Sequence, residues 1–179
     1  MSDAANQYGT ALYELSKEEG LTEEIRQQLR TLLDIFQQEP QFSVRLSTPS
    51  VSKEERCQVL DNALKGRVHP YLLNFLKILT EKGYMKQFPG CCRVFRNLYN
   101  EDKGIVCVTA VTAAPLTPEL REKLRSKLSS VTGKTIDLTC KIDESCLGGV
   151  RLDFDGKQVD GTVRRRLEDV RTLLKNTVL

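Results

Sequence analysis

Residues 148–161 read GGVRLDFDGKQVDG, and they predict a β-hairpin. Asp155 and Gly156 suit the two central positions of a type I′ turn, because both positions need a positive φ. A two-residue turn fixes the register of the strands. We therefore expect four cross-strand pairs, which are Arg151 with Asp160, Leu152 with Val159, Asp153 with Gln158 and Phe154 with Lys157. Alternation along the strands then separates a solvated face from an apolar face, the latter carrying Val150, Leu152, Phe154 and Val159.

The residues that follow the hairpin predict a helix that closes over it. An apolar stripe recurs there at helical spacing, made of Val163, Leu167, Val170 and Leu174. The same helix would carry the basic run 164–166. Successive residues lie about 100° apart on a helix, so the three guanidiniums point in different directions. Arg164 and Arg165 each have an acidic residue four positions later, which favours a solvated helix face over a phosphate-binding one.

Composition places the chain among ordinary soluble globular proteins. It has 179 residues, of which 40% are hydrophobic and 28% charged, with a formal net charge of +3. The first residues do not form a secretory signal, and no run approaches the roughly 20 apolar residues that a membrane span needs. Any association with a membrane is therefore expected to depend on a partner.

The first hundred residues read as helices separated by breakers. Two amphipathic stripes come first, Ala4, Ala5, Tyr8, Ala11, Leu12 and Leu15, then Ile25, Leu29, Leu32, Leu33 and Phe36. After a short segment around 42–46, Ser52 and Glu55 predict a capping box at the start of another helix. Further helices are expected from Pro70 to about Lys82 and after Gly83.

The pattern changes at Gly104, where a β-rich run begins. Residues 105–111 predict a strand, Thr117 with Pro118 a helix start, and residues 135–142 a second strand before the hairpin. We therefore predict a mostly α protein with two domains. Residues 1–103 would form a six-helix-type bundle, and residues 104–179 a smaller α+β domain with a β-hairpin and a C-terminal helix.

The predicted helix from Pro70 to Lys82 is apolar nearly all round. Only Asn74 and Lys77 interrupt it before Thr80. A helix of a small bundle buries one stripe, so the second apolar face needs cover. The helix could be the central one of the bundle, or part of it could line a groove that receives an amphipathic helix of another protein.

Motifs along the whole chain resemble the delta subunit of F-type ATP synthases, the bacterial counterpart of the mitochondrial oligomycin-sensitivity-conferring protein. The C-terminal signature is carried by Gly148-Gly149, Asp160-Gly161 and the run from Val163-Arg164 to Leu167. Weaker similarities lie in the runs 8–13, 42–49, 73–83 and 113–117. Gly9 stands where the family more often has alanine, and Tyr84 where it usually has a basic residue.

This resemblance implies a non-catalytic stator subunit, with no cofactor and no metal. It would hold the catalytic head of the ATP synthase to the peripheral stalk, at the cytoplasmic face of the cell membrane, and touch the membrane only through the complex. The N-terminal helix of an alpha subunit would bind a groove lined by Tyr8, Ala11, Leu12, Leu15, Leu72, Leu73, Leu76 and Leu79. The C-terminal helices of the b subunits would bind beside Val163, Leu167, Val170 and Leu174. On this assignment, Leu76→Asp should abolish head binding.

An unrelated nucleic-acid-binding adaptor, with Arg164–Arg166 on phosphates, is the alternative. Near-neutral charge and the lack of aromatic platforms beside basic residues disfavour it. An enzyme is more distant, because the aspartates of the hairpin fit a turn and a solvated face rather than a catalytic pair. His69 is the chain's one histidine, and the six cysteines show no Cys-x-x-Cys spacing, so a zinc site is not expected. For His69 a structural role is the default.

Overall fold

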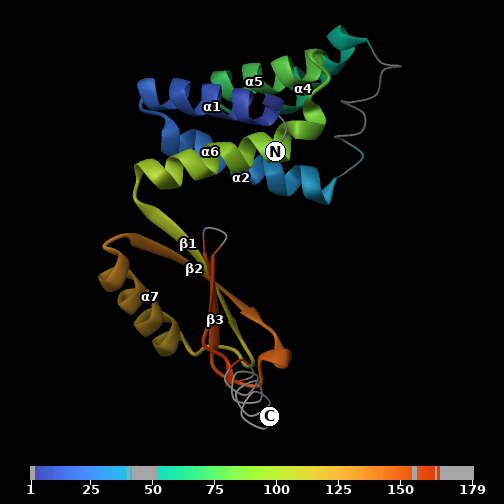
Figure 1. Cartoon of the computed structure of the whole chain (residues 1–179). Coiled ribbons are helices and arrows are strands. Elements are labelled where there is room, and N and C mark those ends of the chain that lie inside the picture. The colour runs from blue at the N-terminus through green and yellow to red at the C-terminus, as the bar shows by residue number, and fades with distance from the viewer. Residues whose placement is uncertain (1–2, 40, 42–51, 155–156, 164, 166–179) are drawn as a thin grey trace, which may run out of the picture. The chain divides into compact units, whose positions relative to one another are not determined.

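The computed structural model describes residues 3–39, 41, 52–154, 157–163 and 165 (Figure 1). The chain divides into two compact units, Met1–Tyr99 and Asn100–Leu179. Helices make up the first unit, and a four-stranded sheet with a helix makes up the second, so the predicted fold class is confirmed. The short segment expected around 42–46, the turn residues Asp155 and Gly156, and nearly all of the C-terminal helix lie outside the described residues.

The helices of the first unit begin and end close to the predicted signals. They are α1 (Asp3–Glu18), α2 (Thr22–Gln38), α4 (Lys53–Leu64), α5 (Pro70–Glu81) and α6 (Phe88–Asp102), with a 3-10 turn, η1 (Met85–Gln87). The capping box is present, since Glu55 N–H donates to Ser52 Oγ at 3.1 Å and Ser52 N–H to Glu55 Oε2 at 3.3 Å. Pro70 occupies the first turn of α5, where its missing N–H costs nothing.

Large apolar side chains fill the interior of the first unit. Phe36 meets Phe88 edge-to-face with ring centroids 5.0 Å apart, and Tyr13 meets Phe95 likewise at 5.3 Å. The completely or almost completely buried side chains are Ile25, Leu60, Leu72, Leu76, Leu79, Met85, Phe88 and Phe95. Burial of these apolar side chains stabilises the bundle.

The buried face of α1 differs from the predicted stripe. Ala5 and Leu12 are buried as expected, but so are Gly9 and Ser16, whereas Leu15 is exposed. A Cβ on Gly9 would lie 2.8 Å from Val94 Cβ and 2.9 Å from the Cys91 carbonyl oxygen on α6. The small residues thus allow close approach of α1 to α6, and Leu15 and part of Tyr8 are left at the surface while Leu12 stays inside.

The second unit is a mixed sheet with one helix. Its elements are β1 (Ile105–Thr112), α7 (Pro118–Thr132), β2 (Thr135–Ile142), a 3-10 turn η2 (Glu144–Cys146), β3 (Val150–Phe154) and β4 (Lys157–Asp160). The strand order is β2-β1-β3-β4, with β1 and β2 parallel and the other neighbours antiparallel. All four predicted cross-strand pairs of the hairpin are present, from Arg151↔Asp160 to Phe154↔Lys157.

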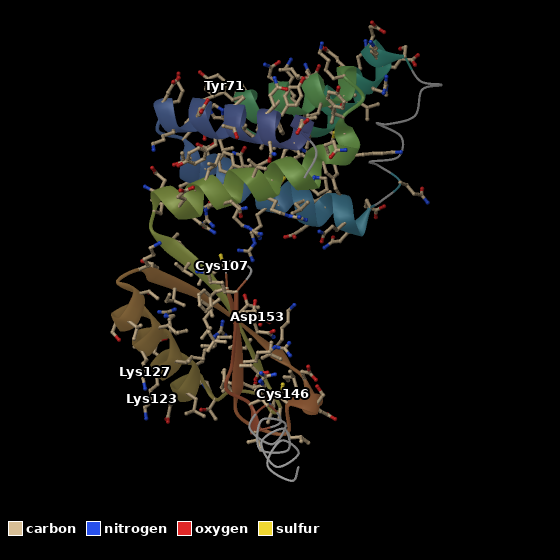
Figure 2. All side chains as sticks on the ribbon, in the orientation of Figure 1. Tyr71, Cys107, Lys123, Lys127, Cys146 and Asp153 are labelled. Carbon is tan, nitrogen blue, oxygen red and sulfur yellow. The ribbon has the colours of Figure 1, made fainter. Side chains whose placement is uncertain are left out.

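The core of the second unit is shallow. It consists of Val108, Ala110, Ile136 and Leu138, against which Leu124 and Leu128 of α7 pack together with Val150, Leu152 and Phe154 of the hairpin. Lys123 and Lys127 project from the other side of α7 (Figure 2). The apolar face predicted for the hairpin is not buried at Val159, and one leucine of α7 is also exposed. Val159 is 54% exposed because β4 is an edge strand, and Leu120 of α7 is 52% exposed.

The outer edge of β2 is covered at its middle. Thr135 N–H donates to the Gly104 carbonyl, so Thr135 and every second residue after it bond toward β1. The carbonyl of Leu138 therefore points to the free edge of the sheet. Arg121 of α7 donates to it from Nη2 at 2.9 Å. One backbone acceptor of an otherwise open edge is thereby satisfied within the unit.

Candidate partner-binding surfaces

An outward strip on α1 is the first candidate surface. The buried residues Gly9, Leu12 and Ser16 define the inner side of the helix. Ala11 and Leu15 lie on the outer side, Leu15 with 38% of its surface exposed, and Tyr8 is half-buried between the two sides. An apolar strip of this kind at i, i+3 and i+7 matches the spacing at which two helices contact one another.

The structure places the residues predicted on α5 mostly inside the bundle. Leu72, Leu76 and Leu79 are fully buried, and the predicted Leu12 of α1 is only 4% exposed. Leu73 is half-buried. Of the eight predicted groove residues, Tyr8, Ala11, Leu15 and Leu73 therefore reach the surface, and the others support it from within. A Leu76→Asp change would bury a charge in the core and unfold the bundle, so the variant expected to abolish head binding cannot test it.

Leu73 and the remaining apolar side chains of α5 lie on different sides of the helix. Leu73 is one turn before Lys77, whose ammonium pairs with Asp61 of α4 at 2.7 Å. Tyr71 and Ile78 share a side about 140° to 160° away from Leu73 on an ideal helix. Both are half-buried. The surface of α5 that faces away from α4 is thus made by two residues that sequence reasoning did not select.

Tyr84 extends the surface beyond the end of α5. Its side chain is 41% exposed, and its ring lies 5.9 Å from the ring of Tyr8, centroid to centroid, at an interplanar angle of 51°. The Tyr8 and Tyr84 rings therefore join α1 to the turn after α5. In the sequence, Tyr84 stands out only as a departure from the family pattern. Its place directly after Lys82-Gly83, where the helix ends, could have indicated an aromatic side chain at the surface.

The second candidate surface lies at one end of the sheet in the second unit. Ile142, Leu147 and Val163 are exposed there, Leu147 by 68%. Val163 N–H donates to the Gly148 carbonyl at 3.0 Å, which holds the start of the last helical segment against the loop. Leu147 has φ 59, a conformation that costs a leucine of the order of 1 kcal/mol. Of the predicted stalk-binding residues, Val163 is described, and Leu167, Val170 and Leu174 lie outside the described residues.

Charged side chains cover the face of the hairpin opposite α7. Arg151 lies 3.6 Å from Asp153 and 4.0 Å from Asp143, nitrogen to oxygen. Thr162 N–H donates to Asp160 Oδ1 at 2.9 Å. The hydrogen bonds from Thr162, helped by the nearby Arg151 and Arg165, lower the pKa of the Asp160 carboxyl. Asp153 and Asp160 thus each have a structural partner, but Arg151 Nε and Asp153 Oδ1 are buried rather than solvated.

Thiol chemistry is disfavoured in the first unit. Burial raises the pKa of the Cys91 thiol to about 11, and burial also raises the pKa of Cys57 and Cys92. These thiols stay protonated at neutral pH and are weak nucleophiles. Within the described ranges, no three His, Cys, Asp or Glu side chains gather so that they could hold a metal ion. Among the described helices, none is both long and apolar enough to cross a bilayer.

Comparison with known families gives one consistent result. A family model described as ATP synthase delta (OSCP) subunit matches residues 4–174. Curated relatives called ATP synthase subunit delta include that of Desulforapulum autotrophicum, 33% identical with 96% of this chain and 94% of the relative covered. Those of Leuconostoc citreum, at 31% identity with 97% of each chain covered, and Symbiobacterium thermophilum, at 29% with 91% and 88% covered, are further examples.

Solved structures share the fold at lower identity. A chain of the Toxoplasma gondii mitochondrial ATP synthase hexamer superposes with a TM-score of 0.73 at 22% identity, over 97% of this chain and 98% of that one. A chain of the Polytomella F-ATP synthase gives a TM-score of 0.53 at 19% identity, over 57% of this chain and 91% of that one. At these identities the likeness concerns the fold.

Proposed function

The chain belongs to the ATP synthase delta (OSCP) subunit family, and from this membership we propose that it works as the stator link between the catalytic head and the peripheral stalk. The delta subunit is a peripheral, structural part of the ATP synthase complex and not its catalytic subunit. The chain would accordingly act at the cytoplasmic face of the cell membrane, which it would reach through the complex. Its task would be mechanical, namely to keep the head from turning with the rotor.

The observation that carries the head-binding part of the proposal is the outward apolar strip on α1. Tyr8, Ala11 and Leu15 are left at the surface because Gly9 and Ser16 take the inner positions. Tyr84 widens the same surface through its contact with Tyr8. We propose that the N-terminal helix of an alpha subunit packs on this strip and on the neighbouring half-buried residues of α5. Burial of apolar area at about 25 cal/mol per Å² would supply the affinity.

The stalk-binding part rests on the second unit. Its exposed apolar residues Ile142, Leu147 and Val163 would contact the C-terminal helices of the b subunits, together with the predicted stripe 167–174. When a protein binds two partners of one complex, each attachment strengthens the other. Once one contact has formed, the other becomes intramolecular, with an effective concentration of about a millimolar for a short connection.

Titration of the full chain with a peptide from the N-terminus of the same organism's alpha subunit tests the head-binding part. We expect Leu15→Asp to weaken binding about tenfold or more, because it places a charge in the centre of the strip. Ile35→Asp on α2 is the matched control, since Ile35 is 44% exposed and Leu15 is 38% exposed. Equal affinities of the two variants, both folded by circular dichroism, would remove α1 from the interface.

Salt dependence separates this proposal from the nucleic-acid alternative. The affinity of a partner bound through an apolar strip should change by only about a few-fold between 50 and 200 mM salt. A protein using several phosphate contacts would lose orders of magnitude in affinity over a similar range. Of the basic run 164–166, Arg165 is described and is exposed. Tight, steeply salt-dependent binding of an oligonucleotide would favour the alternative.

A further inference from the structure

The sheet of the second unit has room for another helix on the face that α7 covers. Neighbouring strands lie about 4.8 Å apart, so the four strands β2-β1-β3-β4 span about 14 Å, whereas a helix with its side chains is about 10 Å wide. α7 contacts β2 more extensively than any other strand, and Arg121 reaches the outer edge of β2 at the Leu138 carbonyl. Among the helices that the structure describes, none covers the hairpin half of this face.

The hairpin half of this face is apolar and only partly buried. Leu152 and Phe154 point to the same side as the buried Ala110, because Leu152 pairs with Ala110 and side chains alternate along a strand. Both are half-buried, and Val159, opposite Leu152 on β4, is exposed. Lys157, opposite Phe154, is exposed on the same side. Contiguous apolar surface of this kind marks a binding site more often than an isolated apolar side chain does.

One flank of α7 borders this surface with two apolar residues and two lysines. Leu120 and Val131 lie about 20° apart on an ideal helix, and both are exposed. Arg121 lies on the opposite flank and reaches the β2 edge, so the flank of Leu120 is the one toward β3 and β4. Lys123 and Lys127 follow on the outward side of the helix (Figure 2). Charged residues flank the apolar seam between two paired helices in the same way.

The charges that border this surface are of one sign. Lys123 and Lys127 have no ion-pair partner in the part of the chain that the structure describes, and Lys157 stands at the opposite border. The acidic residues of the described strands lie on the other face of the sheet, and they are Asp137, Asp153 and Asp160. A partner that carries carboxylates beside its apolar residues is therefore attracted here, whereas a basic partner is repelled.

We propose that an acidic amphipathic helix of a partner protein packs on the hairpin half of the sheet, beside α7. Its apolar stripe covers Leu152, Phe154 and Val159, and its carboxylates lie beside Lys123 and Lys127. One helix fills the width that α7 leaves open, and an amphipathic helix is a common ligand for an apolar surface of this shape. The inference goes beyond the stator role and does not rest on it, because it uses the second unit alone.

Charge and shape favour this occupant over three others. The chain's own C-terminal sequence, from Val163 onward, carries five basic and two acidic side chains and would meet the lysines with like charge. A second copy of the chain would bring the same lysines against themselves. An anionic membrane could meet the lysines, but a flat surface would not reach the hairpin, since α7 rises about 10 Å above the sheet.

Titration of the full chain with two synthetic helical peptides tests the charge requirement. Both peptides carry the same leucine stripe, flanked by glutamates in one and by lysines in the other. We expect the acidic peptide to bind about tenfold more tightly or better at 50 mM salt, with an affinity that falls several-fold at about 200 mM. Amide NMR signals of α7, β3 and β4 should shift. Equal affinities of the two peptides, or shifts confined to Ile142 and Leu147, would overturn the proposal.

Two pairs of variants locate the bound peptide. Lys127→Glu should weaken binding of the acidic peptide about fivefold or more, whereas Lys141→Glu, exposed on the other face of the sheet, should change it less than about twofold. Val159→Thr, which keeps a β-branched side chain, should weaken it about threefold. Its control is Ile142→Thr, because Ile142 is 58% exposed and Val159 54%. Circular dichroism checks that all four variants are folded. Equal effects within either pair would overturn the proposal.

The other occupants have their own readouts in the free chain. Nuclear Overhauser contacts between Val159 and the methyl groups of Leu167 or Val170 would identify the C-terminal segment as the occupant. Sedimentation that shows a dimer sensitive to Lys127→Glu would identify a second copy. Sedimentation with phosphatidylserine vesicles, in the absence of any binding of the acidic peptide, would identify a membrane. Each of these three results would overturn the proposal, and a monomer without such contacts that binds the acidic peptide would support it.

Discussion

The main helices of the two units differ in how deeply they are buried. In the helical unit, α5 has three completely buried leucines, Leu72, Leu76 and Leu79, whereas in the α+β unit α7 has no buried residue. α7 touches its sheet through the half-buried Leu124 and Leu128. Each fully buried leucine contributes about 1.5–3 kcal/mol, so side-chain packing dominates the first unit. The second depends more on its strand ladders and on its helix caps. The helical unit is therefore the more deeply packed of the two, and in the proposed stator role a bound partner would stabilise the α+β unit further.

Removing a core side chain from the helical unit should have the largest effect on stability. We expect Leu76→Ala to lower the free energy of unfolding of the helical unit by about 3–5 kcal/mol, because it leaves a cavity among buried neighbours. Urea titration of the full chain, followed by amide NMR signals of each unit, measures the loss. Signals from residues 105–160 should keep their midpoint. A loss below about 1 kcal/mol would mean that the core is not packed as described.

Filling the contact between α1 and α6 should have a smaller effect. Gly9→Ala gains helix propensity but forces its Cβ against Val94 and the Cys91 backbone, for an expected net loss of about 1–2 kcal/mol. Asn6→Ala on the exposed side of α1 is the control and should change stability by less than about 0.5 kcal/mol. Chemical denaturation of both variants makes the comparison. A more stable Gly9→Ala protein would show that the helices can separate freely.

Truncating a side chain of α7 that packs on the sheet measures how much the shallower core stabilises the α+β unit. We expect Leu124→Ala to destabilise the α+β unit by about 1–2 kcal/mol, since only part of the side chain leaves water on folding. Leu120→Ala, at a position 52% exposed on the same helix, is the matched control and should cost less than half as much. If Leu124→Ala were as costly as Leu76→Ala, the two cores would be equally deep and the contrast would fail.

The smallest expected effect concerns acid stability of the helical unit. Hydrogen bonds from Arg26, then Tyr99 and Gln27, lower the pKa of Glu23 to about 2. A lowered carboxyl pKa stabilises the fold above the unfolded value near 4.5 and loses that contribution as the pH falls toward 2. The Glu23 side chain is 49% exposed, so solvent screening limits its contribution to below about 1 kcal/mol.

Unfolding free energies of the wild type and Glu23→Gln at pH 7 and pH 2.5 check this prediction. The difference between the two proteins should be present at pH 7 and shrink at pH 2.5. Glu24→Gln provides a control, because Glu24 contacts the Gln28 amide and not a guanidinium. A difference between wild type and Glu23→Gln that stays constant with pH would show that the carboxylate is not held by these bonds.

Local chemistry explains which parts of the fold could be predicted. The capping box at Ser52 and Glu55, the start of α7 at Thr117 and the register of the hairpin depend on residues close together in sequence, and all were found where predicted. The inner face of α1 could not be predicted by hydropathy, because Gly9 and Ser16 are buried through contact with another helix. The parallel pairing of β1 with β2 likewise depends on contacts between segments far apart in the sequence.

Tertiary contacts also decide which residues of α5 reach the surface, and the sequence could not separate them from the core residues. An all-round apolar helix gives no periodic signal for its outward side, so the selection on α5 took core leucines with surface ones. Tyr71 and Ile78 follow only once Lys77 is seen to pair with Asp61 of α4. His69 could be read as a structural residue from its place before Pro70. Its use of Nδ1 as an acceptor for the Tyr71 N–H depends on the three-dimensional path of the backbone and does not follow from the sequence.

The hydrogen bond from Arg121 to the Leu138 carbonyl has a consequence for the protein before it joins a complex. An eight-residue strand with a free edge is a template on which a second copy could add its own strand. An incoming strand would have to displace the guanidinium and leave it without its acceptor. The bond therefore opposes strand addition at the β2 edge of the sheet, whereas it leaves the β4 edge unaffected.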